Sequence, residues 1–191
     1  MLMLGVGLSV LASLVWRAEH TGNNWNAMTA QPVAAWRLAS AKVLALALLA
    51  TVMQAVLLLT VLFLGKVVFH LPAWLPARYY AVSVLVVVAS VPVCAAQSAL
   101  SARSRSFVLP VVIGFVLTCV GAVLLAIKVR AALIYAYCLL AHTTQLGSGS
   151  GADASALTIQ SATLTVVLSV ALTALCVLAT ARYFNRTDTH A

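Results

Sequence analysis

The chain has 191 residues, of which 64% are hydrophobic and only 7% are charged, and its formal net charge is +8. Soluble domains carry about 25% charged residues, so this composition excludes a globular domain with a polar surface. The basic excess is explained by loop charges that face anionic lipid at the inner membrane surface, and no nucleic acid partner is required. We therefore expect an all-α fold, that of a polytopic integral membrane protein.

Apolar blocks long enough to cross a bilayer recur along the chain. A hydrocarbon core of about 30 Å requires about 20 helical residues. Four blocks satisfy this requirement, and they cover residues 43–65, 79–100, 107–127 and 162–181. Residues 1–16 reach only about 24 Å, but they end in Trp16 and Arg17, an aromatic–cation pair typical of an interfacial helix end. Because this block lacks the features of a signal peptide, we predict that it is a fifth span.

The apolar block Ala131 to His142 has two interpretations. It reaches only about 18 Å, which favours a re-entrant or interfacial helix within an outer segment that covers residues 128–161. The alternative is a sixth, short span. The Gly/Ser-rich stretch 143–157 that follows is typical of a flexible linker.

Lysine and arginine residues in the connections predict the orientation. With five spans and residues 17–42 inside the cell, seven of these cationic residues lie inside and four outside. If 131–142 is a further span, the balance reverses to five against six. The distribution of cations therefore favours five spans and a cytoplasmic C-terminus.

Few residues of the chain are suited to catalysis or metal binding. There is no GxxxxGK[ST] loop, so the chain cannot bind and hydrolyse a nucleotide in the P-loop manner. The four cysteines are dispersed in apolar segments and the four histidines lie at segment ends, a pattern that predicts no metal site. The three acids, Glu19, Asp153 and Asp188, all lie outside the predicted spans, which argues against a proton- or sodium-driven carrier. We expect no enzyme activity, no metal and no cofactor.

Two glutamines are the most polar residues inside the predicted spans, Gln54 and Gln97. Hydrogen bonds between helices are the favoured role for such residues, and contact with a substrate is the alternative.

The most specific feature is the polar insert RAEHTGNNWNAMTAQP, residues 17–32, which connects the first two predicted spans. Asn23 and Asn24 can cap a short helix that covers Trp25 to Ala30 and that Pro32 ends. A short surface helix with an aromatic ring on one side suits insertion into the groove of a partner.

A second helix is predicted to begin near Val33. It would carry Trp36 and Arg37 at the membrane surface and continue into the span that starts at residue 43.

The insert and the start of the next span carry an acid, Asn-Trp, Pro-Val, Trp-Arg and Ala-Lys in this order, with the residues Glu19, Asn24, Trp25, Pro32, Arg37 and Lys42. This order resembles the loop between the second and third spans of ABC-2 type transporter permeases, and is most similar to the group that includes lantibiotic-immunity permeases. A later span that contains Gly and Pro, an outer re-entrant segment and a short basic C-terminus agree with the resemblance.

The resemblance implies two permease subunits, identical or paralogous, and a separate ABC ATPase that binds ATP and moves them through the cytoplasmic loop. The loop residues implied to contact the ATPase are Glu19, Asn23, Asn24, Trp25, Met28 and Pro32. Trp36, Arg37 and Lys42 are implied to anchor the loop at the lipid headgroups. Ordinary interfacial anchoring without a role in coupling is the alternative for these three residues and for Trp25, and it is the favoured role of Lys42 and Trp36.

The resemblance also implies export of an amphipathic peptide, drug or lipid-like compound across a bacterial plasma membrane, as in antibiotic resistance or immunity. The alternative is a polytopic structural or accessory protein that transports nothing. Family members ordinarily have six spans preceded by an amphipathic segment, so we expect that the first span and this segment are missing from the sequence through truncation or a misassigned start.

Overall fold

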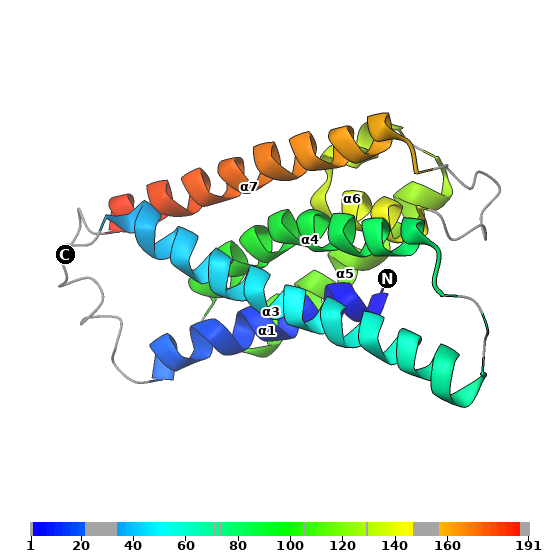
Figure 1. The fold of residues 1–191 in the computed structure, drawn as a ribbon. Helices are drawn as coiled ribbons and strands as arrows, with labels where there is room; N and C mark the ends of the chain where they lie inside the picture. Colours follow the sequence, from blue (N-terminus) through cyan, green and yellow to red (C-terminus); the bar gives the residue numbers. More distant parts are fainter. Residues whose placement is uncertain are drawn as a thin grey trace.

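The structure is a computed structural model that describes residues 2–21, 34–70, 72, 74–104, 106–128, 130–146 and 157–187. Within these residues the chain forms helices and turns and no strand, which confirms the all-α prediction. The α-helices shown in Figure 1 are α1 (Leu2–Thr21), α3 (Ala35–Phe63), α4 (Ala77–Arg103), α5 (Val108–Ala126), α6 (Ala136–Gln145) and α7 (Ile159–Thr187). A π-helical turn, η1 (Leu64–Val68), continues α3, and a 3-10 turn, η2 (Arg130–Ile134), precedes α6.

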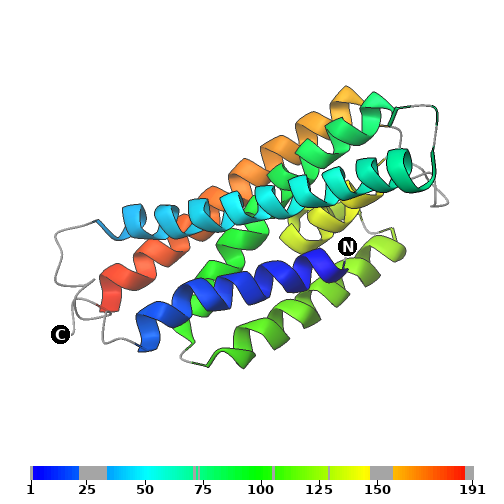
Figure 2. The same cartoon turned by 60° about the horizontal axis from the view of Figure 1, so that its bottom comes forward.

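The long helices alternate in direction along one bundle. Helices α1 and α7 end, and α3 and α5 begin, at the same end of the bundle (Figures 1 and 2). We call this the loop end, because the connection between α1 and α3 leaves from it, and we call the other the far end. Helix α3 with η1, α4, α5 and α7 are each long and apolar enough to cross a membrane, and α1 is a shorter apolar helix. The prediction of four long apolar helices is confirmed, while the crossing of the membrane by α1 stays a prediction.

Helix α6 has 10 residues, or about 15 Å of length, and it lies at the far end without crossing the bundle (Figure 2). Its buried residues are Tyr137, Cys138, Leu139, Leu140, Ala141 and Thr143. This helix is not among those long and apolar enough to cross a membrane, which agrees with the re-entrant or interfacial interpretation.

The helices extend beyond the apolar blocks from which their bounds were predicted. Helix α1 continues past Trp16 to Thr21, and α3 begins at Ala35. The start of α3 agrees with the helix predicted to begin near Val33, and the predicted connection 17–42 is helical at both of its ends. Helices extend beyond apolar blocks because backbone hydrogen bonds continue through polar residues once a helix has formed. Hydropathy identifies only the apolar part of the helix.

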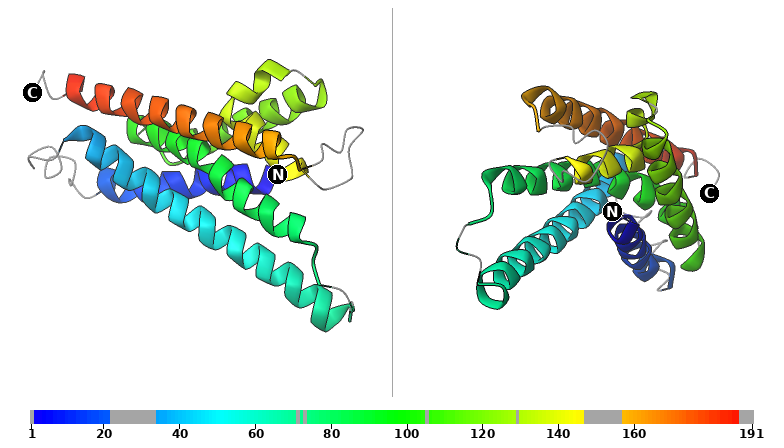
Figure 3. Two further views of the ribbon diagram at one scale, coloured as in Figure 1. Left: turned by 45° about the horizontal axis from the view of Figure 1, so that its top comes forward. Right: turned by 90° about the vertical axis from the view of Figure 1, so that its right-hand side faces the viewer.

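Helix α4 is the centre of the bundle. It packs against α1, α3, α6 and α7, and α3 and α7 diverge from each other toward the far end (Figures 1 and 3). Many of its buried side chains are small, and they include Ala89, Ser90, Ala95, Ser98 and Ala102. Small side chains let helix backbones approach closely, which is how helices associate in lipid. Pro92 removes one backbone donor from the interior of α4, an interruption that neighbouring helices in a membrane tolerate.

Helices α1 and α5 pack through glycines that face small polar residues. A side chain at Gly5 would meet the side chain of Thr118, and a side chain at Gly114 would meet Ser9 and Gln97. Ser9 and Thr118 direct their hydroxyl groups to carbonyls of their own helices, those of Gly5 and Gly114. Their donors are thereby satisfied in a dry interface.

Trp16 joins α1 to two other helices. Its side chain is completely buried, and its indole N–H donates a hydrogen bond of 2.9 Å to the hydroxyl oxygen of Ser98 on α4. The ammonium group of Lys42 on α3 lies 5.4 Å from the centre of its ring. The helix does not end at Trp16 as predicted, because α1 continues to Thr21, and Trp16 is buried between α3 and α4.

Two tyrosines hold α6 against α4 and α5, namely Tyr137 within the helix and Tyr135 directly before it. The amide nitrogen of Gln97 on α4 and the hydroxyl oxygen of Tyr137 are 2.6 Å apart, which confirms hydrogen bonding between helices as the role of this glutamine. The hydroxyl of Tyr135 donates to the carbonyl of Leu117 on α5 at 2.8 Å. Gly121 on α5 lets the backbone of α6 approach, because a Cβ atom there would lie 2.9 Å from the carbonyl carbon of Tyr137.

Removing the Trp16 contacts should destabilise the bundle in two steps. We expect Trp16→Phe, which loses the indole donor, to lower the free energy of unfolding by about 1 kcal/mol. Trp16→Ala also leaves a cavity and should cost about 3 to 5 kcal/mol. Unfolding of the purified chain in mixed micelles of increasing SDS content measures both values. Trp36→Ala is the control, because this side chain is 54% exposed, and equal losses in all three variants would contradict the assignment.

Adding a methyl group at Gly121 should push α6 away from α5. The new Cβ would meet backbone atoms, which cannot rotate aside, so we expect Gly121→Ala to lower the free energy of unfolding by about 1 to 3 kcal/mol. Gly7→Ala is the matched control, because its Cβ would meet only the flexible end of Met53 at 3.2 Å. Comparable unfolding of the two variants in the same micelles would show that Gly121 does not set the position of α6.

Candidate functional site

The connection between α1 and α3 leaves the bundle at the loop end. Five of the residues predicted to contact an ATPase, Asn23, Asn24, Trp25, Met28 and Pro32, lie outside the described residues, as does the helix predicted for residues 25–30. Glu19 lies in the last turn of α1, and the structure describes only the backbone of this residue. The structure therefore defines the two helix ends that carry the loop, while the roles of its residues stay predictions.

The first turn of α3 exposes an aromatic residue and a cation. The carbonyl of Ala34 accepts the N–H of Arg37 at 2.8 Å, and the hydroxyl of Ser40 donates to the carbonyl of Arg37 at 2.9 Å. Trp36 is exposed, and the guanidinium carbon of Arg37 lies 5.5 Å from its ring centre. The start of α3 thus exposes an aromatic ring with a guanidinium group beside it, a combination that suits the predicted contact with headgroups.

Lys42 differs from Trp36 and Arg37 because it faces another helix. Its side chain is half-buried and lies over the ring of Trp16, as described above. The ends of α1 and α3 are thereby joined below the loop. The sequence does not predict this contact, because no spacing rule relates residues on two separate helices.

Cations at the loop end lie over aromatic rings of neighbouring elements. The guanidinium carbon of Arg17 is 5.6 Å from the ring centre of Phe107, at the start of α5, and that of Arg103 on α4 is 4.4 Å from the ring centre of Tyr183 on α7. Such contacts are attractive, since the face of an aromatic ring is negative.

The side chains that the structure describes at this end include five cationic groups and no carboxylate; the cations are Arg17, Arg37, Lys42, Arg103 and Arg182. The loop therefore emerges from a positively charged surface, which can contact anionic lipid or an acidic surface of a partner.

Within the described parts of the chain there is no group of three metal-ligating residues. The four cysteines are free thiols, of which Cys94 and Cys138 are buried. The described side chains at the loop end are thus cations and aromatic rings beside two joined helix ends.

A sequence profile described as "ABC-2 family transporter protein" matches residues 1–121, a segment that contains α1, α3, α4 and most of α5. No curated protein and no solved structure matches the chain. The profile covers more than half of the sequence, including the polar loop and both helices that carry it. This multi-pass membrane protein therefore belongs to the ABC-2 family of transporter proteins.

Proposed function

We propose that the chain is the permease subunit of an ABC exporter, and that a separate ABC ATPase binds it at the loop end and supplies the energy. Membership of the ABC-2 transporter family carries this proposal. The chain contains no P-loop, so ATP binding and hydrolysis are assigned to the partner. No cofactor is assigned to the chain itself.

The joined ends of α1 and α3 support coupling through the loop. A loop between two independent helix ends would absorb a displacement of the ATPase. Here Trp16 contacts Lys42 on α3 and Ser98 on α4, so a force on the loop reaches three helices. In the proposal, Glu19, Asn23, Asn24, Trp25, Met28 and Pro32 contact the ATPase, with Trp25 as the central aromatic side chain.

The distribution of Lys and Arg residues between the two ends of the bundle favours a cytoplasmic loop end. Trp36 and Arg37 are exposed at the start of α3, where they would lie among headgroups. With the loop end inside the cell, seven of the eleven Lys and Arg residues of the sequence are cytoplasmic, as the positive-inside rule requires. The C-terminus, which follows α7, is then cytoplasmic as well. The membrane in this proposal is a bacterial plasma membrane.

A second permease subunit, identical or paralogous, would complete the pathway. Large apolar side chains stay exposed along α3, α5 and α7, and they suit contact with lipid or with another subunit. A pathway between such surfaces would favour an amphipathic peptide, drug or lipid-like compound, the substrate class expected for resistance or immunity.

Trp25→Ala tests the coupling assignment. Loss of a central tryptophan from an interface typically costs about 2 kcal/mol, or about thirtyfold in affinity. We expect this variant to insert into membranes normally and to lose capture of the ABC ATPase encoded beside its gene, measured by co-purification from detergent. Trp36→Ala is the matched control, because this tryptophan lies at the same end on the described start of α3.

Unchanged capture by Trp25→Ala would contradict the role of the loop residue. The broader proposal fails if the neighbouring genes encode no Walker-motif ATPase and the purified chain captures none. That result would favour a structural or accessory protein that transports nothing.

A further inference from the structure

A pocket lies at the far end, where the chain turns from α3 toward α4. The π-turn η1 ends α3, with the N–H of Phe69 bonded to the carbonyl of Leu64 at 2.9 Å. His70 then adopts a φ of 50°, in the left-handed region, which costs energy for a residue other than glycine. This backbone reverses the chain, so that Pro72 and Trp74 lie beside the last turn of the helix. Both π-turns and strained residues are frequent at functional sites.

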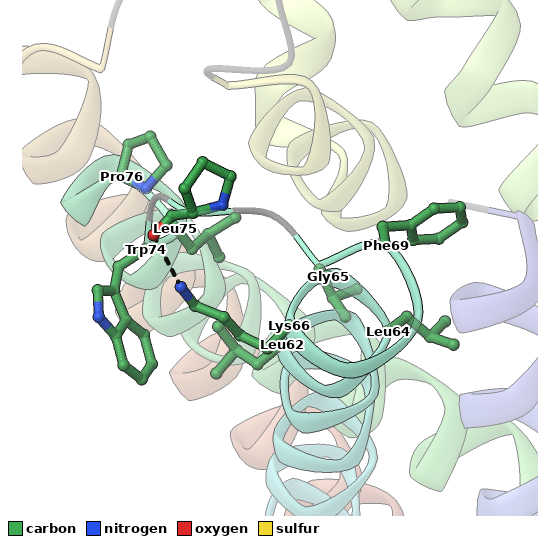
Figure 4. A pocket seen from close by; sticks show the side chains of 10 residues that line it. Leu62, Leu64, Gly65, Lys66, Phe69, Trp74, Leu75 and Pro76 are labelled. Carbon is green, nitrogen blue, oxygen red and sulfur yellow. Dashed lines mark hydrogen bonds between the residues drawn. The ribbon is translucent and has the colours of Figure 1, made fainter.

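The pocket has a volume of about 510 Å³, within the range of about 300 to 1,000 Å³ typical of small-molecule sites. Its walls are almost entirely apolar and include Leu62, Leu64, Phe69, Leu75 and Pro76. Figure 4 shows Phe69 and Leu64 on one side and Trp74 on the other, with the end of the helix between them. A pocket of this size and lining suits a small molecule with a largely apolar body.

The charged group beside the pocket is engaged within the chain. The ammonium group of Lys66 donates a hydrogen bond of 3.1 Å to the carbonyl of Pro72 and lies 4.6 Å from the ring centre of Trp74, and Lys66 has a further interaction. Pro72 and Pro76 have no backbone N–H to offer. A charged or hydrogen-bonding ligand group would therefore lose water against these walls with little in return. The walls favour an uncharged ligand that is mainly hydrocarbon.

The length of α3 and η1 places the pocket in a headgroup layer. Arg37 and Phe69 are 32 residues apart, which corresponds to about 48 Å of helix. Even at a tilt of about 40°, about 37 Å of this length lies along the membrane normal, more than the hydrocarbon thickness of about 30 Å. With Arg37 among the headgroups of one leaflet, as proposed above, the pocket lies among those of the other.

Large apolar side chains of the pocket stay exposed in this layer. Phe69 is 68% exposed and Trp74 is 72% exposed. The hydrocarbon core of the bilayer ends before it reaches them, so the acyl chains of bulk lipid are poorly placed to cover both rings. An apolar molecule that binds between the rings removes this surface from water and headgroups, which is favourable.

We propose that this pocket binds an uncharged, mainly hydrocarbon small molecule that reaches the membrane surface at the far end. The ligand lies with Phe69 and Leu64 on one side and Trp74 on the other. The proposal rests on the position of Arg37 among the headgroups, and it is independent of transport and of capture of an ATPase by the loop. In the orientation proposed above, the surface is the outer one.

Quenching of tryptophan fluorescence by 1-bromohexane tests the site, because this probe is uncharged and Trp74 forms one wall. The full chain is reconstituted in phosphatidylcholine vesicles, and the probe is added in increasing amounts. The signal of Trp74 is the difference between the chain and its Trp74→Phe counterpart. We expect quenching of this signal to saturate, because a pocket holds a fixed amount of ligand, whereas a probe that merely dissolves in the bilayer quenches further with every addition.

Leu64→Asn should raise the amount of probe needed for half-maximal quenching about tenfold, because it replaces an apolar wall by a polar one. Leu49→Asn is the matched control, since it makes the same substitution on α3 at a side chain of nearly equal exposure, 40% against 41%, outside the pocket. Val61→Phe keeps the wall apolar and fills part of the pocket, so it should also raise this amount.

Quenching without saturation would overturn the proposal, as would a half-maximal amount that is unchanged in both Leu64→Asn and Val61→Phe. An equal shift in Leu49→Asn would overturn it as well, because the effect would not belong to the pocket. Saturable quenching of the Trp74 signal by phosphatidylcholine with brominated acyl chains, in the absence of 1-bromohexane, would also overturn it and would assign the pocket to a bilayer lipid.

Discussion

Close packing between helices is the constraint on which this structure depends. In lipid, burial of apolar side chains gives little driving force for association, so helices must be held by close contact of their backbones and by buried hydrogen bonds. The chain meets this requirement with glycine and serine between α1 and α5, and with Gly121 beneath α6. The few buried polar groups then join specific helices, as Trp16 joins α1 to α4 and Gln97 joins α4 to α6.

The two buried hydrogen bonds meet on one turn of α4. Gln97 and Ser98 are adjacent, and Gln97 contacts α6 while Ser98 contacts α1, the helix that leads into the loop. A displacement of α1 at the loop end therefore acts on the same turn that holds α6. The Pro92 interruption lies one to two turns away on the same helix, where a missing backbone bond makes bending easier.

Helix α3 and the π-turn η1 that continues it each carry a lysine that lies over a tryptophan ring, in different surroundings. At the loop end, Lys42 lies over Trp16, which is buried between helices. At the far end, Lys66 lies over Trp74, which is exposed beside an apolar pocket. The first pair connects two helices, whereas the second lies at the surface beside the pocket. The same pair of side chains therefore lies in a buried environment at one end and in an exposed environment at the other.

The sequence by itself determined the membrane class, the four long apolar helices and the short helix near the far end, because each depends on local composition or chain length. The family resemblance on Glu19, Asn24 and Trp25 likewise needed only the order of residues, and the match over residues 1–121 supports it. Helix bounds were less accurate, since helical hydrogen bonds extend beyond the apolar blocks.

Only the tertiary structure decided that Trp16 is buried, that Lys42 contacts it, and that Lys66 borders a pocket. The sequence shows the glycines of α5 but not the side chains that they face. These properties arise from contacts between residues far apart in the chain, which hydropathy and spacing do not report. In a sequence that is almost uniformly apolar, many packings suit the pattern equally well, and the shapes of a few small residues and the partners of a few polar groups select one of them.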